Sequence, residues 1–112
     1  MKLLIAGSRN ITDIDIAPYI PEGVELIVSG AATGIDALAE QYADQMRLSK
    51  YIMRPNYARY QRAAPIKRND AMVDFCDQVL VFWDGVSKGT KHTIAYAKKT
   101  GKPIAVIMVP PK

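Results

Sequence analysis

Three short polar segments of the sequence carry residue types that hold phosphate and sugar groups. The first, Gly7-Ser8-Arg9-Asn10, offers a glycine, a hydroxyl, a guanidinium and an amide directly after an apolar run. A guanidinium suits phosphate because its planar fork presents paired hydrogen-bond donors. A plain polar turn explains the same four residues equally well. This segment therefore indicates a binding site only in combination with the other two.

The second segment, Ser29-Gly30-Ala31-Ala32-Thr33-Gly34-Ile35-Asp36, is the stronger signal. Gly30 and Gly34 leave backbone amides free to approach a phosphate or a ribose. Asp36 has two compatible interpretations, because its carboxylate could accept hydrogen bonds from sugar hydroxyls or could cap the following helix. The segment is not a Walker loop, since no Gly-Lys-Ser/Thr follows, and its glycine spacing differs from the dinucleotide fingerprint.

The third segment, Asp84-Gly85-Val86-Ser87-Lys88-Gly89-Thr90, follows an apolar run that ends in Trp83. It precedes a predicted helix, so Ser87, Gly89, Thr90 and their amides could form a second anion cradle. Trp83 could stack on a base, although a buried core position is the commoner one for tryptophan. This segment, like the second, predicts contact with a phosphorylated ligand.

Positive charge is distributed unevenly along a chain whose net charge is +4. No acidic residue occurs between Asp44 and Asp70, or after Asp84. The first of these stretches holds Arg47, Lys50, Arg54, Arg59, Arg62, Lys67 and Arg68. One-signed stretches attract anions, although a solvated basic face explains most of these side chains equally well. Arg68 and Asn69, early in a predicted helix, would bring a cation and an amide to the same site.

The elements that must position these segments alternate between strand and helix. Runs rich in valine, isoleucine and leucine predict buried strands at residues 3–6, 25–29, 51–54, 78–83 and 104–109. Apolar residues at helical spacing predict an amphipathic helix over 33–48, with Thr33 and Asp36 as a capping box. Two more helices are predicted, from Pro65 to about Cys76 and over 90–100. Residues 11–22 are expected to form a short helix or turn.

This alternation implies right-handed crossovers and a parallel sheet covered by helices on both faces. The predicted fold is α/β, with one domain over residues 1–112: a Rossmann-like three-layer α/β/α arrangement with a mainly parallel sheet of about five strands. Ligands of such sheets bind beyond the carboxyl ends of the strands, where helix N-termini favour anions. All three polar segments are therefore expected at one edge of the sheet.

Composition narrows the compartment and the chemistry. Cys76, the only cysteine, excludes an intrachain disulfide, favours a cytoplasmic location and is expected in the core. The apolar run at the N-terminus is too short for a signal peptide or a membrane span. No ligand spacing indicates a bound metal, and no other cofactor is expected. His92, the only histidine, has no evident carboxylate to orient it, so a catalytic triad is not expected.

In this combination and order, the motifs resemble those of the SLOG superfamily, most of all its small YspA-type branch. The segments that carry the resemblance are Gly7-Ser8-Arg9, Ser29 to Asp36, Arg68-Asn69 with Met72, and Phe82 to Thr90. The resemblance implies a Rossmann-like fold, a nucleotide-derived ligand and a homo-oligomer. The superfamily includes proposed ligand sensors, the Lonely Guy cytokinin-activating phosphoribohydrolases and the DNA-processing protein DprA. It therefore implies a ligand class but does not decide a reaction.

The Lonely Guy enzymes carry an arginine in a helix and a Gly-Thr-x-x-Glu motif whose glutamate serves N-glycoside cleavage. Arg68 resembles that arginine and Gly89-Thr90 the Gly-Thr pair, but Thr93 stands at the glutamate position. A threonine hydroxyl neither carries negative charge at neutral pH nor acts readily as a base. The family's Gly-Gly pair is likewise Gly30-Ala31 here.

The leading hypothesis is a binding module that captures a nucleotide or related ribosyl ligand and signals through a partner or oligomer. Its predicted ligand-binding residues are Gly7, Ser8, Arg9, Gly30, Ala31, Gly34, Asp36, Arg68, Asn69, Trp83, Ser87, Gly89 and Thr90. Two alternatives stay open. One is an enzyme that cleaves an N-glycosidic bond. The other is a protein that binds single-stranded nucleic acid, because Tyr51, Tyr57 and Tyr60 alternate with arginines.

Overall fold

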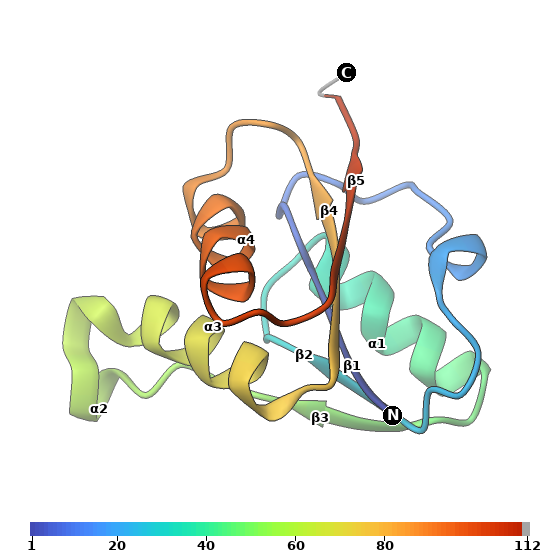
Figure 1. Ribbon diagram of the computed structural model, residues 1–112, viewed down its shortest axis with the longest axis horizontal. Helices are drawn as coiled ribbons and strands as arrows, with labels where there is room; N and C mark the ends of the chain where they lie inside the picture. The colour runs from blue at the N-terminus through green and yellow to red at the C-terminus, as the bar shows by residue number, and fades with distance from the viewer. Residues whose placement is uncertain (111–112) are drawn as a thin grey trace.

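A parallel sheet of five strands forms the centre of the computed structural model, which describes residues 1–110 (Figure 1). In chain order the strands are β1 (Lys2–Gly7), β2 (Leu26–Ser29), β3 (Ser49–Ile52), β4 (Gln78–Trp83) and β5 (Ile104–Met108). Their order across the sheet is β3-β2-β1-β4-β5, and every neighbouring pair is parallel. The predicted α/β fold with a parallel sheet is confirmed. The last two residues of the predicted domain, 111–112, lie outside the described residues.

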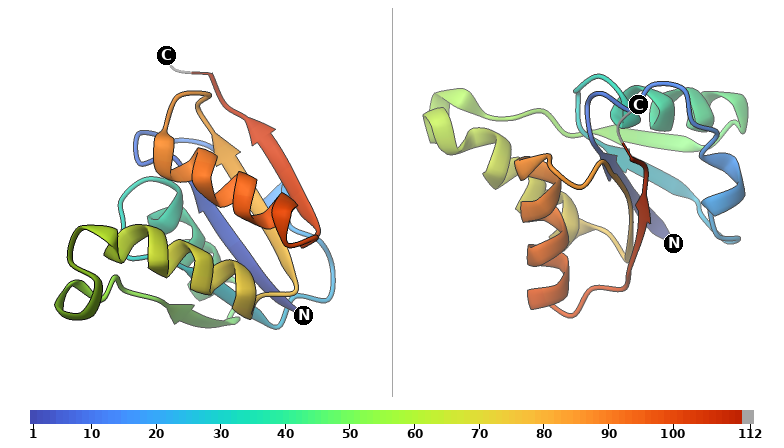
Figure 2. Two further views of the ribbon diagram at one scale, coloured as in Figure 1. Left: turned by 60° about the vertical axis from the view of Figure 1, so that its left-hand side comes forward. Right: turned by 90° about the horizontal axis from the view of Figure 1, so that it is seen from above.

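Helices cover both faces of the sheet, which completes the three layers (Figure 2). One face carries α1 (Ile35–Gln45), and the other carries α3 (Ala64–Phe75) and α4 (Lys88–Lys99). Three short elements complete the list: η1 (Ala17–Tyr19), α2 (Tyr57–Tyr60) and η2 (Gln61–Ala63). None of the helices within residues 1–110 is long and apolar enough to cross a bilayer.

Alternating side chains of the central strands fill two separate cores. Leu3 and Ile5 pack with Ile35 under α1, whereas Leu4 of the same strand packs with Val73 and Ile94 under α3 and α4. Successive side chains of a strand point to opposite faces, so a strand buried on both faces is a continuous apolar run. The apolar runs of the sequence therefore mark the strands with two covered faces, β1, β2 and β4.

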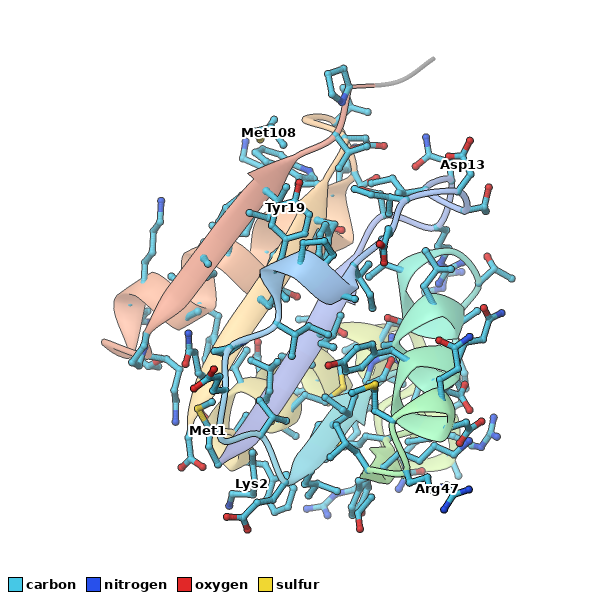
Figure 3. The ribbon with its side chains drawn as sticks, turned by 90° about the vertical axis from the view of Figure 1, so that its right-hand side faces the viewer. Met1, Lys2, Asp13, Tyr19, Arg47 and Met108 are labelled. Atoms are coloured by element: carbon cyan, nitrogen blue, oxygen red, sulfur yellow. The ribbon has the colours of Figure 1, made fainter. Side chains whose placement is uncertain are left out.

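The segment between β1 and β2 forms only one turn of 3-10 helix, η1, in agreement with the short helix or turn predicted there. The Tyr19 ring packs edge-on against Phe82, with ring centroids 5.5 Å apart. Figure 3 shows this segment lying across the strands on the face that α1 also covers. The predicted helical layer on that face is thus completed by an irregular segment.

Several predicted element boundaries are wrong; the helix predicted over 90–100, for example, begins at Lys88. In two cases the structure explains the difference. The helix predicted over 33–48 is α1, which ends at Gln45 because Arg47 takes a left-handed conformation (φ 55°) and its amide turns back to Asp44. The strand predicted over 51–54 begins earlier, at Ser49. This edge strand exposes Ser49, Lys50 and Tyr51, so its first half lacks the apolar signature of a buried strand.

Candidate functional site

A cavity of about 430 Å³ opens at the carboxyl ends of β1 and β4. The chain leaves β1 towards β2 and leaves β4 towards β5, on opposite sides of this pair. Loops that diverge in this way leave a crevice at the sheet edge, which is the usual ligand position in open parallel sheets. The cavity is lined by Ala6, Gly7, Ser8, Arg9, Asn10, Ala32, Asp36, Pro65, Arg68, Asn69, Met72, Asp84, Ser87, Gly89, Thr90 and Thr93.

Most of the predicted ligand-binding residues line this cavity. They are Gly7, Ser8, Arg9, Asp36, Arg68, Asn69, Ser87, Gly89 and Thr90. Three others lie elsewhere: Gly30 is buried next to the cavity, Ala31 lines an adjoining one, and Trp83 donates its Nε1 proton to the Ser87 carbonyl oxygen. Gly34 is also buried and packs against the first loop. The three polar segments therefore meet at one edge, although Gly30, Ala31 and Gly34 of the second segment do not line this cavity.

Several lining residues were not among the predicted ones. On α3, Pro65 and Met72 lie three residues before and four residues after Arg68, and on α4 Thr93 lies four residues after Gly89. Residues three or four apart share a helix face. Helical spacing counted from Arg68 and Gly89 is the signal in the sequence that finds these three positions.

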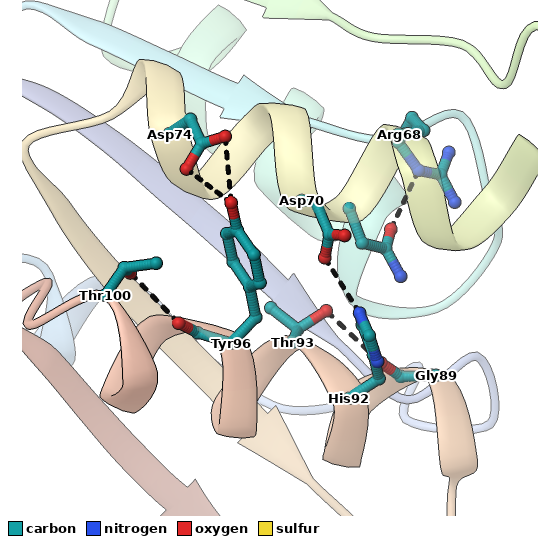
Figure 4. A network of polar contacts seen from close by, with 9 residues as sticks. Arg68, Asp70, Asp74, Gly89, His92, Thr93, Tyr96 and Thr100 are labelled. Atoms are coloured by element: carbon teal, nitrogen blue, oxygen red, sulfur yellow. Dashed lines mark hydrogen bonds and ion pairs between the residues drawn. The ribbon is translucent and has the colours of Figure 1, made fainter.

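Arg68 is a half-buried cation at the wall of the cavity. Its Nε donates to Asn69 Oδ1 at 2.8 Å (Figure 4), and its Nη1 donates to the Met53 carbonyl oxygen at 3.4 Å. Within residues 1–110 no carboxylate lies within ion-pair distance of this guanidinium. Burial lowers the pKa of Arg68, and the nearby charge of Asp36 opposes that shift. The cation is therefore partly desolvated while its charge is not neutralised by direct pairing.

Asp36 is one of two buried carboxylates that line the cavity, with 8% of its surface exposed; the other is Asp84. Its Oδ2 accepts a hydrogen bond from the Ala32 amide at 3.2 Å. Burial raises the pKa of this carboxyl, while the Ala32 hydrogen bond and then the Arg68 charge lower it. Protonation of Asp36 is thus easier than that of an exposed aspartate.

The predicted capping box of Thr33 and Asp36 is wrong. The helix begins at Gly34, whose φ of 70° and ψ of −126° turn the chain, and no side chain caps it. Thr33 is exposed outside the turn, and Asp36 instead reaches back to the Ala32 amide. A capping box requires an extended residue at the cap position, and the positive φ of glycine provides a different entry into the helix.

Asp84 organises the third loop. Its Oδ1 accepts from the Val86 and Ser87 amides at 2.9 and 2.8 Å, and its Oδ2 accepts from Ser87 Oγ at 2.9 Å. These hydrogen bonds lower the pKa of Asp84 to about 2. The Asp84 amide donates to Ser8 Oγ at 3.2 Å, which ties the third loop to the first. Asp84 is therefore a fully engaged, ionised structural group.

The N-terminus of α4 lies at the cavity, where Gly89 and Thr90 of its first turn line the wall. The helix starts after Ser87, whose side chain makes no capping hydrogen bond. The first hydrogen bond within the helix is donated by the Lys91 amide to the Ser87 carbonyl oxygen. The preceding amides, those of Lys88, Gly89 and Thr90, have no acceptor within the helix because of their position in its first turn. Such amides and the helix dipole favour an anion.

Thr93, at the position of the glutamate in the enzymes that the motif resembles, faces the cavity. It is buried, with 3% of its surface exposed, and its Oγ1 donates to the Gly89 carbonyl oxygen at 3.2 Å (Figure 4). The hydroxyl therefore forms a hydrogen bond to the backbone of the first turn of α4. It supplies no charge to the cavity.

His92 does have a carboxylate partner, contrary to the expectation from the sequence. Its Nε2 lies 2.8 Å from Asp70 Oδ1, and one turn further along the same helices Tyr96 donates to Asp74 at 2.8 Å (Figure 4). The partners are 22 residues apart in the sequence, so only the packing of α3 on α4 brings them together. Neither His92 nor Asp70 lines the cavity, and the nearby Ser87 hydroxyl is bound to Asp84.

Other residues singled out in the sequence have structural surroundings. Cys76 is buried in the core under α3, as predicted, and burial raises the pKa of its thiol to about 12. Tyr51 packs against Phe75, and the Arg59 guanidinium lies over the Tyr60 ring. Nowhere in the described part of the chain do three histidine, cysteine or acidic side chains gather as metal ligands.

Comparison with known proteins finds a relative that aligns with this chain over nearly the whole of both proteins. The Gene 61 protein of Mycobacterium phage D29 is 32% identical to this chain over 117 aligned positions, which cover 92% of this chain and 93% of that protein. No family model and no solved structure matches the chain.

Proposed function

We propose that this chain, which belongs to the family of the Gene 61 protein of Mycobacterium phage D29, binds a nucleotide or nucleotide-derived ligand in the cavity at the carboxyl ends of β1 and β4. The name of that relative states no ligand and no activity. The proposal is supported by the chemistry of the cavity walls, above all by Arg68.

Arg68 is the observation that carries the proposal. A guanidinium that is half-buried and has no ion-pair partner pays for its desolvation unless an anion binds beside it. Across the same cavity, the first-turn amides of α4 at Gly89 and Thr90 offer donors without a negative group of their own. A phosphate between the guanidinium and these amides would satisfy both.

The remaining polar groups suit a ribose. Asp36 presents a carboxylate to the cavity, and Asn10 presents an amide. Hydroxyls of a sugar donate to a carboxylate and accept from an amide N–H, so both groups have matching partners on a ribosyl phosphate. Inorganic phosphate alone would leave this part of the cavity unused.

The site supports binding better than turnover. N-glycoside cleavage develops positive charge on the ribose and uses a carboxylate to stabilise it or to activate water. Asp84 is engaged by three donors from its own loop, and Thr93 is uncharged. We infer that the domain is a sensor or binding module that acts through a partner or a homo-oligomer.

One observation favours the enzymatic alternative. Asp36 lines the cavity and has a raised pKa, which is a property of carboxyl groups that act as general acids. Chromatography of each nucleoside monophosphate after incubation with the protein distinguishes the two functions, because only an enzyme releases the free base.

The proposal is tested by calorimetric titration of the wild-type protein and two arginine variants with AMP. Loss of a charged hydrogen bond costs about 1.5–3 kcal/mol, so Arg68→Ala should weaken AMP about 10- to 150-fold. Arg62→Ala is the matched control, because Arg62 is exposed in η2 and does not line the cavity. Equal affinity of Arg68→Ala and the wild type would contradict the assigned role.

A further inference from the structure

We propose that a second cavity, next to the first, receives the base of the bound nucleotide, which stacks on the ring of Tyr57. This inference rests on the proposed function, because it assigns the part of the same ligand that the first cavity does not hold. The second cavity has a volume of about 340 Å³. Its walls come from the second loop, the connection before α2, and the start of α3.

The two cavities adjoin, because Arg9, Ala32, Pro65 and Arg68 line both of them. A ligand whose phosphate lies beside Arg68 in the first cavity is therefore placed next to the second. The first-turn residues Gly89 and Thr90 of α4 line only the first cavity, so the anionic end of the ligand belongs there and the base belongs in the second.

The second cavity has the surface that a planar base needs. Beyond the shared residues it is lined by Ala31, Thr33, Pro55 and Tyr57, none of which carries a charge. Tyr57 is 60% exposed, which leaves most of its ring free. An aromatic face can stack on any of the bases, and the apolar surfaces of proline and alanine suit the other sides of a planar ring.

Tyr57 differs from the neighbouring tyrosines in having this surface free. The ring of Tyr51 is occupied by Phe75, and the ring of Tyr60 by the Arg59 guanidinium. Tyr57 lies close enough to Arg68 for the two groups to interact electrostatically. Its backbone is also held in place, because the Asn56 side chain accepts the Arg59 amide at 3.1 Å and caps α2.

The test compares AMP with ribose 5-phosphate, which has the same phosphate and sugar but no base. Stacking on an aromatic side chain contributes about 1–3 kcal/mol per base, so AMP should bind the wild type about 5- to 150-fold more tightly. Tyr57→Ala should remove that advantage and leave the affinity for ribose 5-phosphate unchanged. Tyr57→Phe should retain it, since the ring is kept. Tyr60→Ala is the matched control and should behave as the wild type.

The outcomes separate the base subsite from the proposed function. Equal affinity of the wild type for AMP and ribose 5-phosphate overturns the base subsite without any variant, and so does an AMP advantage that persists in a folded Tyr57→Ala. In both cases, weaker binding of both ligands to Arg68→Ala still supports the phosphate site. If neither compound binds the wild type, the base subsite and the proposed function both fail.

Discussion

Asp36 and Arg68 both approach the α-carbon of Gly30 so closely that a methyl group there would stand 2.7 Å from Asp36 Oδ2 and 2.8 Å from Arg68 Nη1. The buried carboxylate and the half-buried guanidinium are thus held over the same glycine without forming a direct ion pair. Each influences the pKa of the other, and in both cases burial has the larger effect. A change at either residue should therefore be measurable through its partner.

Asp36→Asn should become progressively more stable than the wild type as the pH rises. Burial raises the pKa of Asp36 in the folded protein above its ordinary 3.8, so the folded state holds this proton more tightly than the unfolded chain. Ionisation of Asp36 then lowers the free energy of unfolding as the pH rises from about 3.8 through the raised pKa. Asparagine avoids this cost, and its amide oxygen can still accept the Ala32 amide.

Urea unfolding of both proteins from acidic to neutral pH measures this difference, and all other titrating groups cancel in it. The gap between the two free energies of unfolding should open with increasing pH. A gap that stays constant, or that closes, would show that burial does not control the ionisation of Asp36.

Gly34→Ala should destabilise the protein more than Gly23→Ala. Both glycines have a positive φ, of 70° and 83°, so both substitutions incur backbone strain of about 1–3 kcal/mol. Only Gly34 is also in close contact, because a side chain there would meet the backbone of Ser8 and Arg9, whereas Gly23 has open space. The comparison by chemical unfolding isolates the packing of the second loop on the first. Equal losses in the two variants would contradict that packing.

Gly89→Ala should separate stability from binding. Nothing lies within 4 Å of the position that the new methyl group would take, and its φ is not in the left-handed region. Alanine at a compatible glycine position stabilises a protein by about 0.4–1 kcal/mol. The same methyl group stands at the cavity wall beside the first-turn amides, so AMP should bind more weakly. Thermal unfolding and calorimetric titration should thus change in opposite directions, and unchanged AMP affinity would place the phosphate elsewhere.

Thr93→Glu is the most direct way to install hydrolysis. The variant places a carboxylate in the cavity at the position where the enzymes that the sequence motif resembles carry one, and it should release adenine from AMP slowly. Thr93→Gln has the same length without the charge and serves as the control. The wild type should release no base over the same period. Base release by the wild type that is lost in Arg68→Ala would identify an enzyme and leave Asp36 as the carboxylate to test.

The order of elements follows from the sequence because the apolar patterns are strong. The continuous apolar runs of β1 and β4 and the helical spacing of apolar residues in α1 leave one interpretation for each of these segments. The rule for parallel sheets then brings loops that are far apart in the sequence, such as those at Ser8 and Asp84, to one edge. Their hydrogen bond confirms that meeting.

The features that the sequence does not predict depend on contacts between distant residues or on single backbone angles. The pair of Asp70 and His92 exists only because α3 packs on α4, and neither residue marks the other. The start of α1 depends on a backbone angle at Gly34, which a capping pattern does not encode. Trp83 does not line the cavity, and its indole donates a hydrogen bond to the Ser87 carbonyl oxygen. That a residue is tryptophan does not show whether its ring faces a ligand or its own loop.

The central claim is that a nucleotide binds at the carboxyl ends of β1 and β4. Amide chemical shifts in a nuclear magnetic resonance titration test this claim most directly. The isotope-labelled protein is titrated with AMP, GMP, CMP and UMP. Saturable shifts are expected at residues 7–10, 68–69 and 87–90, and Arg68→Ala should reduce them at equal ligand concentration. The account is contradicted if none of the four nucleotides shifts these amides, or if the shifts gather at the opposite end of the sheet around Glu25 and Asp77.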